Sequence, residues 1–400
     1  MKNTTFLIST LLACLLLFGC ASNADLNNPE NTSDNYVPSD NYIPSSPSLP
    51  PQTAKPVKVV EPYKGGPIFI EGDKEFTTTN GVTNGSGTKT DPYIIDLAGW
   101  PMDIASADKS KRSVSVGISI SETSKYFVIK NCQITDSTFK SENNFGIGIS
   151  LLYAENGRIE NCTISEVHSG IIPDGVTNVV IANSIVQNGY DGIGSSTGGH
   201  SSDGLTVLDS TITGNENNGI TLIFLHNGRA ENNVVNKNGR GIRLSSAADS
   251  NVLNNTLADN VWAGIEVDSG NWVGGIDNNT VSYNTVSGTS NGYGIRLGGK
   301  HNVVSYNTVN RNIKGILIGG TNIDVLYNTA NSNQEYGFYI VSENNTITDN
   351  SATSNNMIQE FNTDYDTKIK TPKYYDFCIT KTSNVFERNA YGTVSNEWWC

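Results

Sequence analysis

A glycine recurs at nearly constant intervals through the middle of the chain, and this repeat restricts the possible folds more than any other feature. From about residue 124 to 352 the unit reads apolar-x-x-Asn-x-apolar, a short polar stretch, then Gly-Ile-x-apolar. The intervals are 24, 22, 27, 22, 23, 30, 21 and 22 residues. A period of this size indicates a solenoid, in which each repeat packs only against its neighbours. The repeat glycines are Gly146, Gly170, Gly192, Gly219, Gly241, Gly264, Gly294, Gly315 and Gly337.

The repeat unit predicts strands rather than helices. Its apolar residues are spaced i, i+2 in short runs rich in Val, Ile and Thr, and no unit has room for an amphipathic helix of about ten residues. Asn and Gly separate the runs and supply the positive φ angles that tight turns require. We therefore expect an all-β solenoid of about ten rungs, spaced about 4.8 Å apart.

One column of side chains can be aligned from rung to rung. We expect its Asn residues to be buried and to hydrogen-bond along the stack, which makes the column a structural device. The predicted column contains Cys132, Cys162, Ser184, Ser210, Asn233, Asn255, Asn279, Asn307, Asn328 and Asn350.

The N-terminus has the pattern of an export signal. Lys2 precedes a short apolar run, residues 6–18, which is too short to span a bilayer as a helix but suits a secretory signal. The run ends in Leu17-Phe18-Gly19-Cys20-Ala21-Ser22, which resembles the lipobox of prokaryotic lipoproteins and implies cleavage after residue 19 and acylation of Cys20. A generic signal peptide with a chance Cys is the alternative. Residues 20–62 are rich in Pro, Ser and Asn and predict a disordered tether.

Several segments resemble a known family. Gly66-Pro-Ile-Phe-Ile-Glu-Gly72, Asp91-Pro-Tyr-Ile-Ile95 and Ser124-Lys-Tyr-Phe-Val-Ile-Lys-Asn-Cys132, together with the repeats, resemble archaeal and bacterial surface proteins built on the right-handed parallel β-helix. These belong to a superfamily of carbohydrate-binding proteins and sugar hydrolases. The resemblance implies a right-handed helix with three sheets. It divides the chain into an N-terminal cap with the first rungs (63–123), β-helix repeats (124–353) and a C-terminal cap (354–400).

Four cysteines remain after the signal and the lipid site. Cys132 and Cys162 share one column on consecutive rungs, so their Cα atoms should lie within disulfide distance. Two buried, stacked thiols are the alternative. Cys378 and Cys400 can tie down the C-terminal cap, and an exported chain permits both bonds.

The insertion at residues 188–205, which lengthens one repeat to 27 residues, is the first candidate site. His168 aligns one rung from Tyr190, and Asp191, His200 and Asp203 are near in sequence. Such groups can act as acid and base on a sugar if they converge on one position. The alternative is that Asp191 and Asp203 form turns and the histidines are solvated. The motifs of polygalacturonases, pectate lyases and mannuronan epimerases are incomplete or missing, so the sequence leaves catalysis open. A lyase, an epimerase and a glycosidase are the enzyme classes that it would fit.

A second candidate strip lies two residues after successive repeat glycines. Arg243, Glu266 and Arg296 fall on consecutive rungs and predict either a surface ion-pair ladder or a groove that holds a sugar acid. Trp262 and Trp272 are candidates for stacking on sugar rings. No cofactor is expected, Ca²⁺ is left open, and no metal ligands are assigned.

The net charge of the chain argues against some classes of binding partner. With 26 Lys and Arg against 39 Asp and Glu, the net charge is −13, which argues against nucleic acid and against a basic face on anionic lipid. We expect membrane contact through the lipid alone, at a cell or outer membrane, facing the exterior or the periplasm. The expected function is binding, with processing as a further option, of a polysaccharide or surface glycan. The alternative is a purely structural or adhesive surface solenoid.

Overall fold

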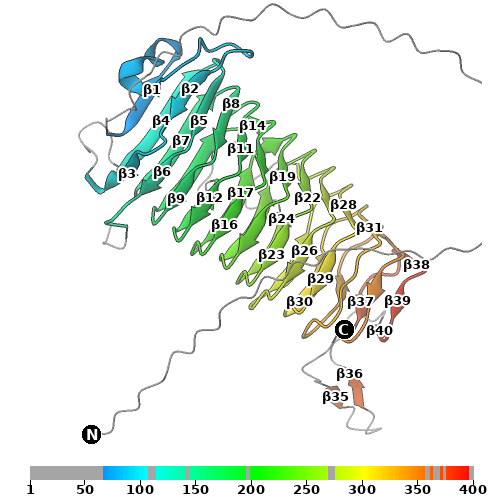
Figure 1. Ribbon diagram of the computed structural model, residues 1–400. Helices are drawn as coiled ribbons and strands as arrows, with labels where there is room; N and C mark the ends of the chain where they lie inside the picture. The colour runs from blue at the N-terminus through cyan, green and yellow to red at the C-terminus, as the bar shows by residue number, and fades with distance from the viewer. Residues whose placement is uncertain are drawn as a thin grey trace, which may run out of the picture. The chain divides into compact units, whose positions relative to one another are not determined.

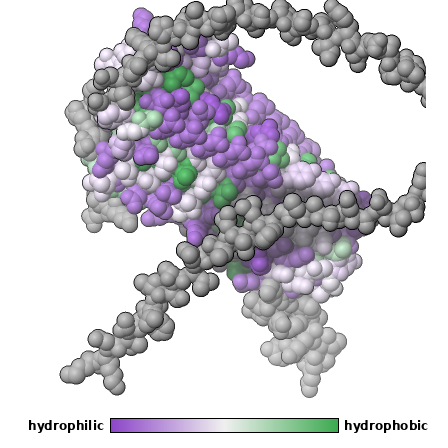
Figure 2. Space-filling model, viewed as in Figure 1, coloured by the Kyte–Doolittle hydropathy of each residue, from purple (hydrophilic) through white to green (hydrophobic). Residues whose placement is uncertain are grey.

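Short parallel strands stacked rung upon rung form most of the molecule (Figure 1). The structure is a computed structural model that describes residues 66–106, 114–139, 145–194, 199–268, 275–355, 361–363, 370–372 and 375–395. Cys20, Trp272, Cys400 and the predicted signal and tether lie outside the described residues. Hydrophilic side chains cover much of the visible face, with isolated hydrophobic patches between them (Figure 2). Within the described part, no helix has the length and apolarity of a membrane span.

Three long sheets make up the solenoid in the described residues, and each of the central rungs gives one strand to each sheet. Sheet A contains thirteen strands: β1 (Ile68–Glu71), β4 (Val116–Thr123), β7 (Ile147–Ala154), β10 (Ser169–Asp174), β13 (Asp191–Ile193), β17 (Asn218–Ile223), β21 (Arg240–Ser245), β24 (Ala263–Asp268), β27 (Tyr293–Leu297), β30 (Lys314–Ile318), β32 (Phe338–Ile340), β37 (Phe377–Ile379) and β40 (Val394–Ser395).

Sheet B follows sheet A in each rung. Its strands are β2 (Tyr93–Asp96), β5 (Phe127–Lys130), β8 (Gly157–Glu160), β11 (Val180–Ala182), β15 (Thr206–Leu208), β19 (Arg229–Glu231), β22 (Asn251–Leu253), β25 (Thr280–Ser282), β28 (Val303–Ser305), β31 (Asp324–Leu326), β33 (Thr346–Thr348) and β38 (Val385–Glu387).

Sheet C completes the rung. Its strands are β3 (Pro101–Asp103), β6 (Gln133–Thr135), β9 (Thr163–Ser165), β12 (Ile185–Gln187), β16 (Thr211–Thr213), β20 (Val234–Asn236), β23 (Thr256–Ala258), β26 (Thr285–Ser287) and β29 (Thr308–Asn310). The remaining elements are β14 (Ser202–Asp203), β18 (Leu225–His226), β34 (Ser351–Ala352), β35 (Phe361–Thr363), β36 (Lys370–Pro372), β39 (Ala390–Tyr391) and the short 3₁₀ helices η1 (Asp73–Glu75), η2 (Thr78–Asn80) and η3 (Ile104–Ser106).

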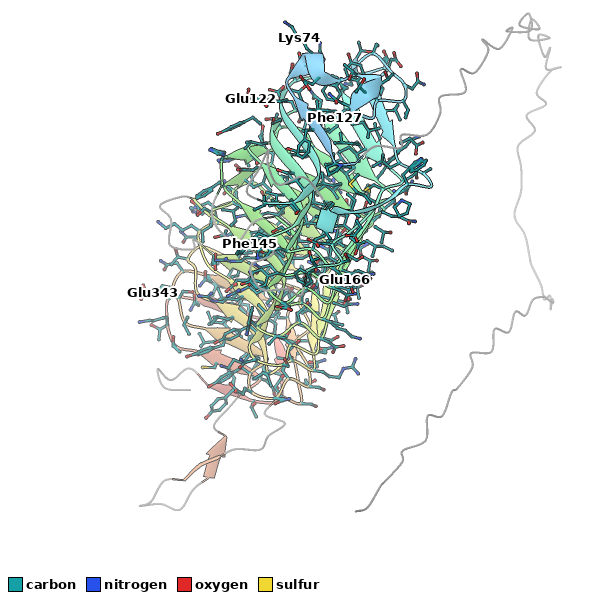
Figure 3. All side chains as sticks on the ribbon, turned by 90° about the vertical axis from the view of Figure 1, so that its left-hand side faces the viewer. Lys74, Glu122, Phe127, Phe145, Glu166 and Glu343 are labelled. Carbon is teal, nitrogen blue, oxygen red and sulfur yellow. A yellow bond between two sulfur atoms is a disulfide. The ribbon has the colours of Figure 1, made fainter. Side chains whose placement is uncertain are left out.

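The core is a set of aliphatic columns inside the solenoid. In sheet C the middle residue of each three-residue strand points inward, as Val186, Ile212 and Val235 do, and is buried, while its two neighbours face outward. This is the alternation that a strand with one buried face requires. Figure 3 shows side chains along the whole stack, with Phe127 near its N-terminal end. The aliphatic periodicity of the sequence therefore becomes one continuous core.

Close backbone approach explains the repeat glycines. A Cβ atom on Gly241 would lie 2.4 Å from the carbonyl oxygen of Gly264 on the next rung and 2.7 Å from Leu257 Cδ2. Gly192 faces the oxygen of Gly219 in the same way, at 2.3 Å. Neither Gly241 nor Gly192 has a φ in the left-handed region. Glycine is therefore required at these positions for space rather than for a turn.

Buried polar ladders occupy the three corners between the sheets. At each corner, a backbone N–H donates to the side-chain oxygen of the equivalent residue one rung further along the chain. Between sheets B and C the ladder is Ser184, Ser210, Asn233, Asn255, Asn284, Asn307, Asn328, Asn350 and Asn389. The other corners have shorter ladders of the same polarity, which include Asn279 and Asn302, and Asn215 and Asn238.

The predicted ladder is confirmed except at one position. Asn284, not Asn279, fills the column, and Asn279 lies in the ladder between sheets A and B. Both residues are buried, so the error is one of register rather than of environment.

The residue before each ladder position in the B–C corner has a left-handed backbone, with φ between 48° and 61°. Asn and Asp fill this position on several rungs, as expected of residues that tolerate positive φ. Three rungs instead use tyrosines, Tyr283, Tyr306 and Tyr327. Their exposed rings stack in a row, with centroids 4.9 Å apart at each step.

A disulfide opens the same B–C column. Cys132 and Cys162 are bonded, with their Cα atoms 4.5 Å apart, as their shared column predicts. Cys378 is also disulfide-bonded, whereas the other half of its predicted pair, Cys400, lies outside the described residues.

The solenoid continues beyond residue 353 into the segment expected to be a cap. β37 and β38 add a further rung to sheets A and B, and Phe377 stacks on Phe338 at 4.5 Å. Phe386 packs against the core. The C-terminal segment is therefore partly a rung of the solenoid, and its Tyr374, Trp398 and Trp399 lie outside the described residues.

Candidate functional site

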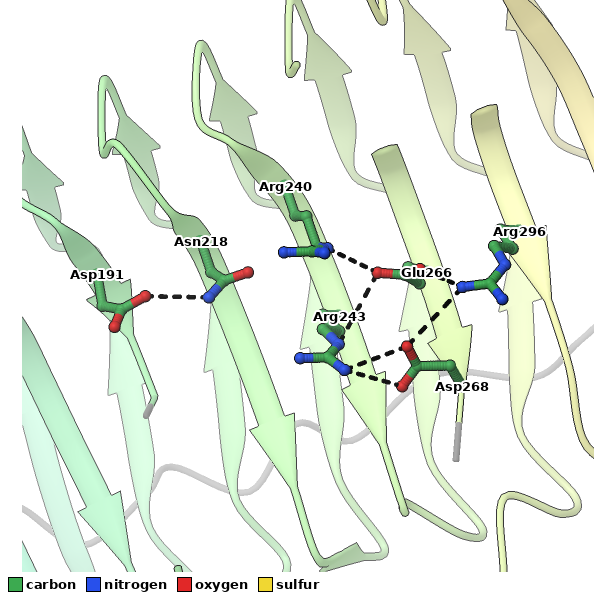
Figure 4. A network of polar contacts seen from close by, with 7 residues as sticks. All are labelled: Asp191, Asn218, Arg240, Arg243, Glu266, Asp268 and Arg296. Carbon is green, nitrogen blue, oxygen red and sulfur yellow. Dashed lines mark hydrogen bonds and ion pairs between the residues drawn. The ribbon is translucent and has the colours of Figure 1, made fainter. Parts of the chain in front are cut away.

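The outward face of sheet A carries a concentration of charge over strands β21, β24 and β27. In-register pairing places Arg243 beside Glu266, and Glu266 beside Arg296, as the repeat alignment predicts. Arg240 and Asp268 join them from β21 and β24 (Figure 4). We call these five residues the arginine network.

Glu266 lies at the centre of the arginine network. One of its carboxylate oxygens accepts a hydrogen bond from Arg240 Nε at 2.8 Å, and the other accepts one from Arg296 Nη1 at 2.6 Å. Arg243 Nη2 donates to both oxygens of Asp268 at 3.2 Å. The expectation that Glu266 faces solvent is wrong, because only 6% of the residue is exposed. Burial among guanidinium groups compensates its charge.

The network retains unused donors toward solvent. Three guanidinium groups face two carboxylates, which leaves a local excess of one positive charge. The side chain of Arg296 is 46% exposed and that of Arg240 is 30% exposed. The Arg240 guanidinium also lies 5.1 Å from the ring centre of Trp262, itself 41% exposed. A positive strip with an exposed aromatic ring beside it is therefore available to a ligand.

The five predicted acid and base residues do not converge. His168 and Tyr190 do meet, with their rings stacked at 4.9 Å, and Phe145, labelled in Figure 3, packs on the other side of His168 at 5.1 Å. His168 directly precedes β10, and Tyr190 directly precedes the neighbouring strand β13. His200 instead contacts Asp174, the last residue of β10. Five residue steps separate the ends of β10, or about 16 Å of extended chain. The single-patch constellation is thus not formed.

Asp191 and Asp203 have structural partners. Asp191 is 5% exposed and accepts hydrogen bonds from the side-chain amides of Asn217 and Asn218 at 2.9 and 3.0 Å. Asp203 accepts one from Asn227 at 2.8 Å. Both carboxylates lie in strands, β13 and β14, rather than in turns, and both bond to a neighbouring rung.

His200 belongs to a different pair. Its Nδ1 lies 3.1 Å from Asp174 Oδ2, and its ring contacts that of Tyr153 with centroids 4.6 Å apart. A carboxylate on Nδ1 favours the tautomer with the proton on that nitrogen and leaves Nε2 as a proton acceptor. His200 also lines an open pocket of about 440 Å³ with Phe224, His226 and Ser246.

A second, smaller cleft lies beside His200 and reaches the strand next to the arginine network. His200, Asp174 and Thr221 line this cleft, and Thr221 pairs in register with Arg243 on the next strand. Two buried polar atoms, Thr221 Oγ1 and Arg243 Nε, have no hydrogen-bond partner in the described structure. Unsatisfied buried donors and acceptors are costly, so the position of Thr221 in the lining of the cleft marks this as the best candidate site.

Sequence reasoning missed four residues of this site. The predicted strip includes only the position two residues after each repeat glycine. Arg240 directly precedes Gly241 and Asp268 is four residues after Gly264, so the same repeat alignment could have placed both. Asp174 and Tyr153 lie on β10 and β7, but His200, which contacts them, has no equivalent position in the repeat. Within the described chain, no group of three or more His, Cys, Asp or Glu side chains is arranged to hold a metal ion.

Comparison with known proteins decides the fold. The family model described as a right handed beta helix region matches residues 113–223 and, in an overlapping match, 147–299. The chain is a right-handed parallel β-helix. No curated protein matches it in sequence.

Solved structures resemble this β-helix at low identity. The Agl-KA catalytic domain is 14% identical, with a TM-score of 0.50 over 76% of this chain and 59% of that one. The DFA-IIIase of Arthrobacter chlorophenolicus A6, without its lid, is 11% identical, with a TM-score of 0.50 over 72% and 74%. The A-module of the Azotobacter vinelandii mannuronan C-5 epimerase AlgE6 is 15% identical, with a TM-score of 0.48 over 76% and 87%. At these identities the likeness to the Agl-KA domain and to the DFA-IIIase shows the fold alone.

Proposed function

We propose that this β-helix is an exported, lipid-anchored protein that binds an acidic polysaccharide along the outer face of sheet A. The observation that carries the proposal is the arginine network, with its excess positive charge and its exposed donors on Arg240 and Arg296. Arginine binds carboxylates through paired N–H donors, and successive rungs about 4.8 Å apart offer contacts to several units of one chain. The net charge of −13 makes this local positive strip the place for an anionic ligand. The proposed anchor rests on Cys20.

The test compares two arginines of equal exposure. Arg296→Gln removes one donor group from the network but leaves Glu266 paired with Arg240. Arg229→Gln is the matched control, since Arg229 is 47% exposed, pairs with Glu231 and lies on sheet B. The purified protein is titrated with alginate, polygalacturonate and neutral dextran, with and without Ca²⁺.

We expect an acidic polymer to bind and Arg296→Gln to weaken it about tenfold, as loss of a charge-assisted pair implies. The control variant should bind as the parent does, and added salt should weaken both. Absence of binding to any acidic polymer, or equal losses in both variants, would refute the proposal and favour a purely structural or adhesive solenoid.

Processing of the bound chain is a second candidate function, favoured by the His200–Asp174 pair. The pair lines the cleft with Thr221, whose in-register neighbour is Arg243, so a sugar unit that spans both strands would contact a proton acceptor and a guanidinium group together. The assay follows unsaturated uronate and new reducing ends. His200→Gln should abolish any product, and the exposed His301→Gln should not. Binding without product in the parent protein would leave the binding proposal standing and remove this one.

A further inference from the structure

Eight consecutive strands of sheet C present an outward face without ionisable side chains, and Asp103 on β3 adjoins it at the N-terminal end. Strands β6, β9, β12, β16, β20, β23, β26 and β29 pair in strict register, and each points two residues outward, sixteen in all. None of the sixteen is charged and none is buried. We call them the neutral face: Gln133, Thr135, Thr163, Ser165, Ile185, Gln187, Thr211, Thr213, Val234, Asn236, Thr256, Ala258, Thr285, Ser287, Thr308 and Asn310.

The corresponding strands of sheet B show that this composition is particular to sheet C. The same number of positions on β5, β8, β11, β15, β19, β22, β25 and β28, which share the same eight rungs, includes five charged residues, Lys130, Arg158, Glu160, Arg229 and Glu231. Sheet A carries the arginine network. Figure 2 shows pale and green patches on the lower left side, where Figure 1 places β6, β9, β12 and β16.

The neutral face is a stiff, regular array of hydroxyl and amide groups. Seven rung intervals of about 4.8 Å give it a length of about 34 Å. Threonine dominates its first column, and its branched Cβ limits side-chain rotation, so little entropy is lost when the face is covered. The stacked Tyr283, Tyr306 and Tyr327 add a row of phenol groups at the adjacent corner. Desolvation and the neighbouring phenols raise the pKa of Tyr306, which keeps its hydroxyl protonated.

This chemistry excludes most classes of partner. A polyanion or an anionic membrane needs cations, and the face has none. A protein interface relies on aromatic and arginine anchors near its centre. The sixteen residues include neither, and the tyrosine row lies outside them at the corner. Uncharged hydroxyls and amides instead match a partner that is itself neutral and covered with hydroxyl groups, at a small desolvation cost.

We propose that the neutral face adsorbs to the surface of a solid, uncharged polysaccharide. Each hydroxyl contact is weak, so affinity requires many contacts at once, which a solid surface offers and a short soluble chain does not. Ice is the other ordered, neutral surface. The mixed second column, with Gln187, Asn236 and Asn310 among smaller residues, lacks the uniform spacing that matching a lattice of water would need. This inference does not depend on acidic-chain binding at sheet A.

The experiment measures co-sedimentation of the full-length protein with microcrystalline cellulose, crystalline chitin and insoluble β-1,3-glucan. The test variant is Thr211→Lys with Thr285→Lys on sheet C. Its matched control is Thr206→Lys with Thr280→Lys on sheet B, which adds the same charge on the same two rungs. Circular dichroism and unfolding midpoints verify that both variants fold.

We expect the parent to adsorb to at least one solid, independently of salt, and the sheet C variant to bind about tenfold more weakly, because two ammonium groups must be desolvated. The sheet B variant and Arg296→Gln should adsorb as the parent does, which separates this face from the arginine network. Three outcomes would overturn the proposal: adsorption to none of the solids, equal losses in the sheet B and sheet C variants, or an effect of the parent on ice growth without adsorption to any polysaccharide.

Discussion

Replacing Asn255 by leucine tests whether the buried ladders hold the rungs together. Asn255 Oδ1 accepts hydrogen bonds from the backbone N–H and the side-chain amide of Asn233, at 2.9 and 3.0 Å. Its own amide donates to the carbonyl oxygen of Ala230 and to Asn284 Oδ1. Leucine has a similar volume but can make none of these bonds, so the substitution separates hydrogen bonding from packing.

The expected loss follows from the groups left without partners. The backbone N–H of Asn233 loses its acceptor outright, and Ala230 loses one donor. At about 1–3 kcal/mol for each stranded buried group, Asn255→Leu should lower the free energy of unfolding by about 2–4 kcal/mol. Asn255→Ser should cost less, about 1 kcal/mol for the small cavity, because serine still accepts from the preceding N–H. Ser210 already acts in this way in the same ladder, accepting from Ser184 N at 3.1 Å.

Urea denaturation followed by circular dichroism measures both variants. Asn251→Leu, on the outward side of the same rung, is the surface control and should change stability by less than about 0.5 kcal/mol. Because a solenoid can unfold in parts, amide hydrogen exchange at the neighbouring rungs should localise the loss. If the serine variant is less stable than the leucine variant, packing and not hydrogen bonding governs the ladder, and the reasoning fails.

Three further predictions concern other parts of the chain. Gly241→Ala should lower stability by about 1–3 kcal/mol in the same denaturation assay, because its Cβ would overlap the carbonyl oxygen of Gly264; an unchanged midpoint would refute the close-approach argument. The bond from Arg388 holds the pKa of Asp349 below its ordinary 3.8, so their pairing stabilises the protein fully above that pH and is lost as the pH falls through the lowered value. Arg388→Gln should therefore lower the thermal midpoint at pH 7 and have progressively less effect below pH 3.8, and a pH-independent difference would contradict this. Cys20→Ser should release the protein from membranes or block its processing, and unchanged membrane fractionation would remove the lipid anchor.

The fold was readable from the sequence because its determinants are periodic. Repeat glycines, aliphatic columns and ladder residues each recur once per rung, so aligning the repeats also aligns the rungs in space. The one ladder error shows the limit of this method. Asn279-Thr-Val and Asn284-Thr-Val are identical motifs five residues apart in a lengthened rung, and spacing alone does not decide which one continues the column.

The candidate site was predictable only where it follows the period. The contacts of Glu266 with Arg243 and Arg296, and the meeting of His168 and Tyr190, follow from rung alignment. His200 contacts the end of β10 from a position with no counterpart in the other repeats, so sequence spacing could not assign its partner. The burial of Glu266 depends on arginine side chains from neighbouring rungs, so the sequence alone did not predict it.

The common polarity of the corner ladders gives the chain a direction of assembly. The backbone N–H of each ladder residue finds its acceptor on the following rung, as Asn233 does on Asn255 and Asn328 on Asn350. A chain that emerges from its N-terminus first therefore always has a newest rung whose corner donors lack buried acceptors. Each rung is completed only when the next one arrives, so folding can advance with synthesis or export but trails it by one turn.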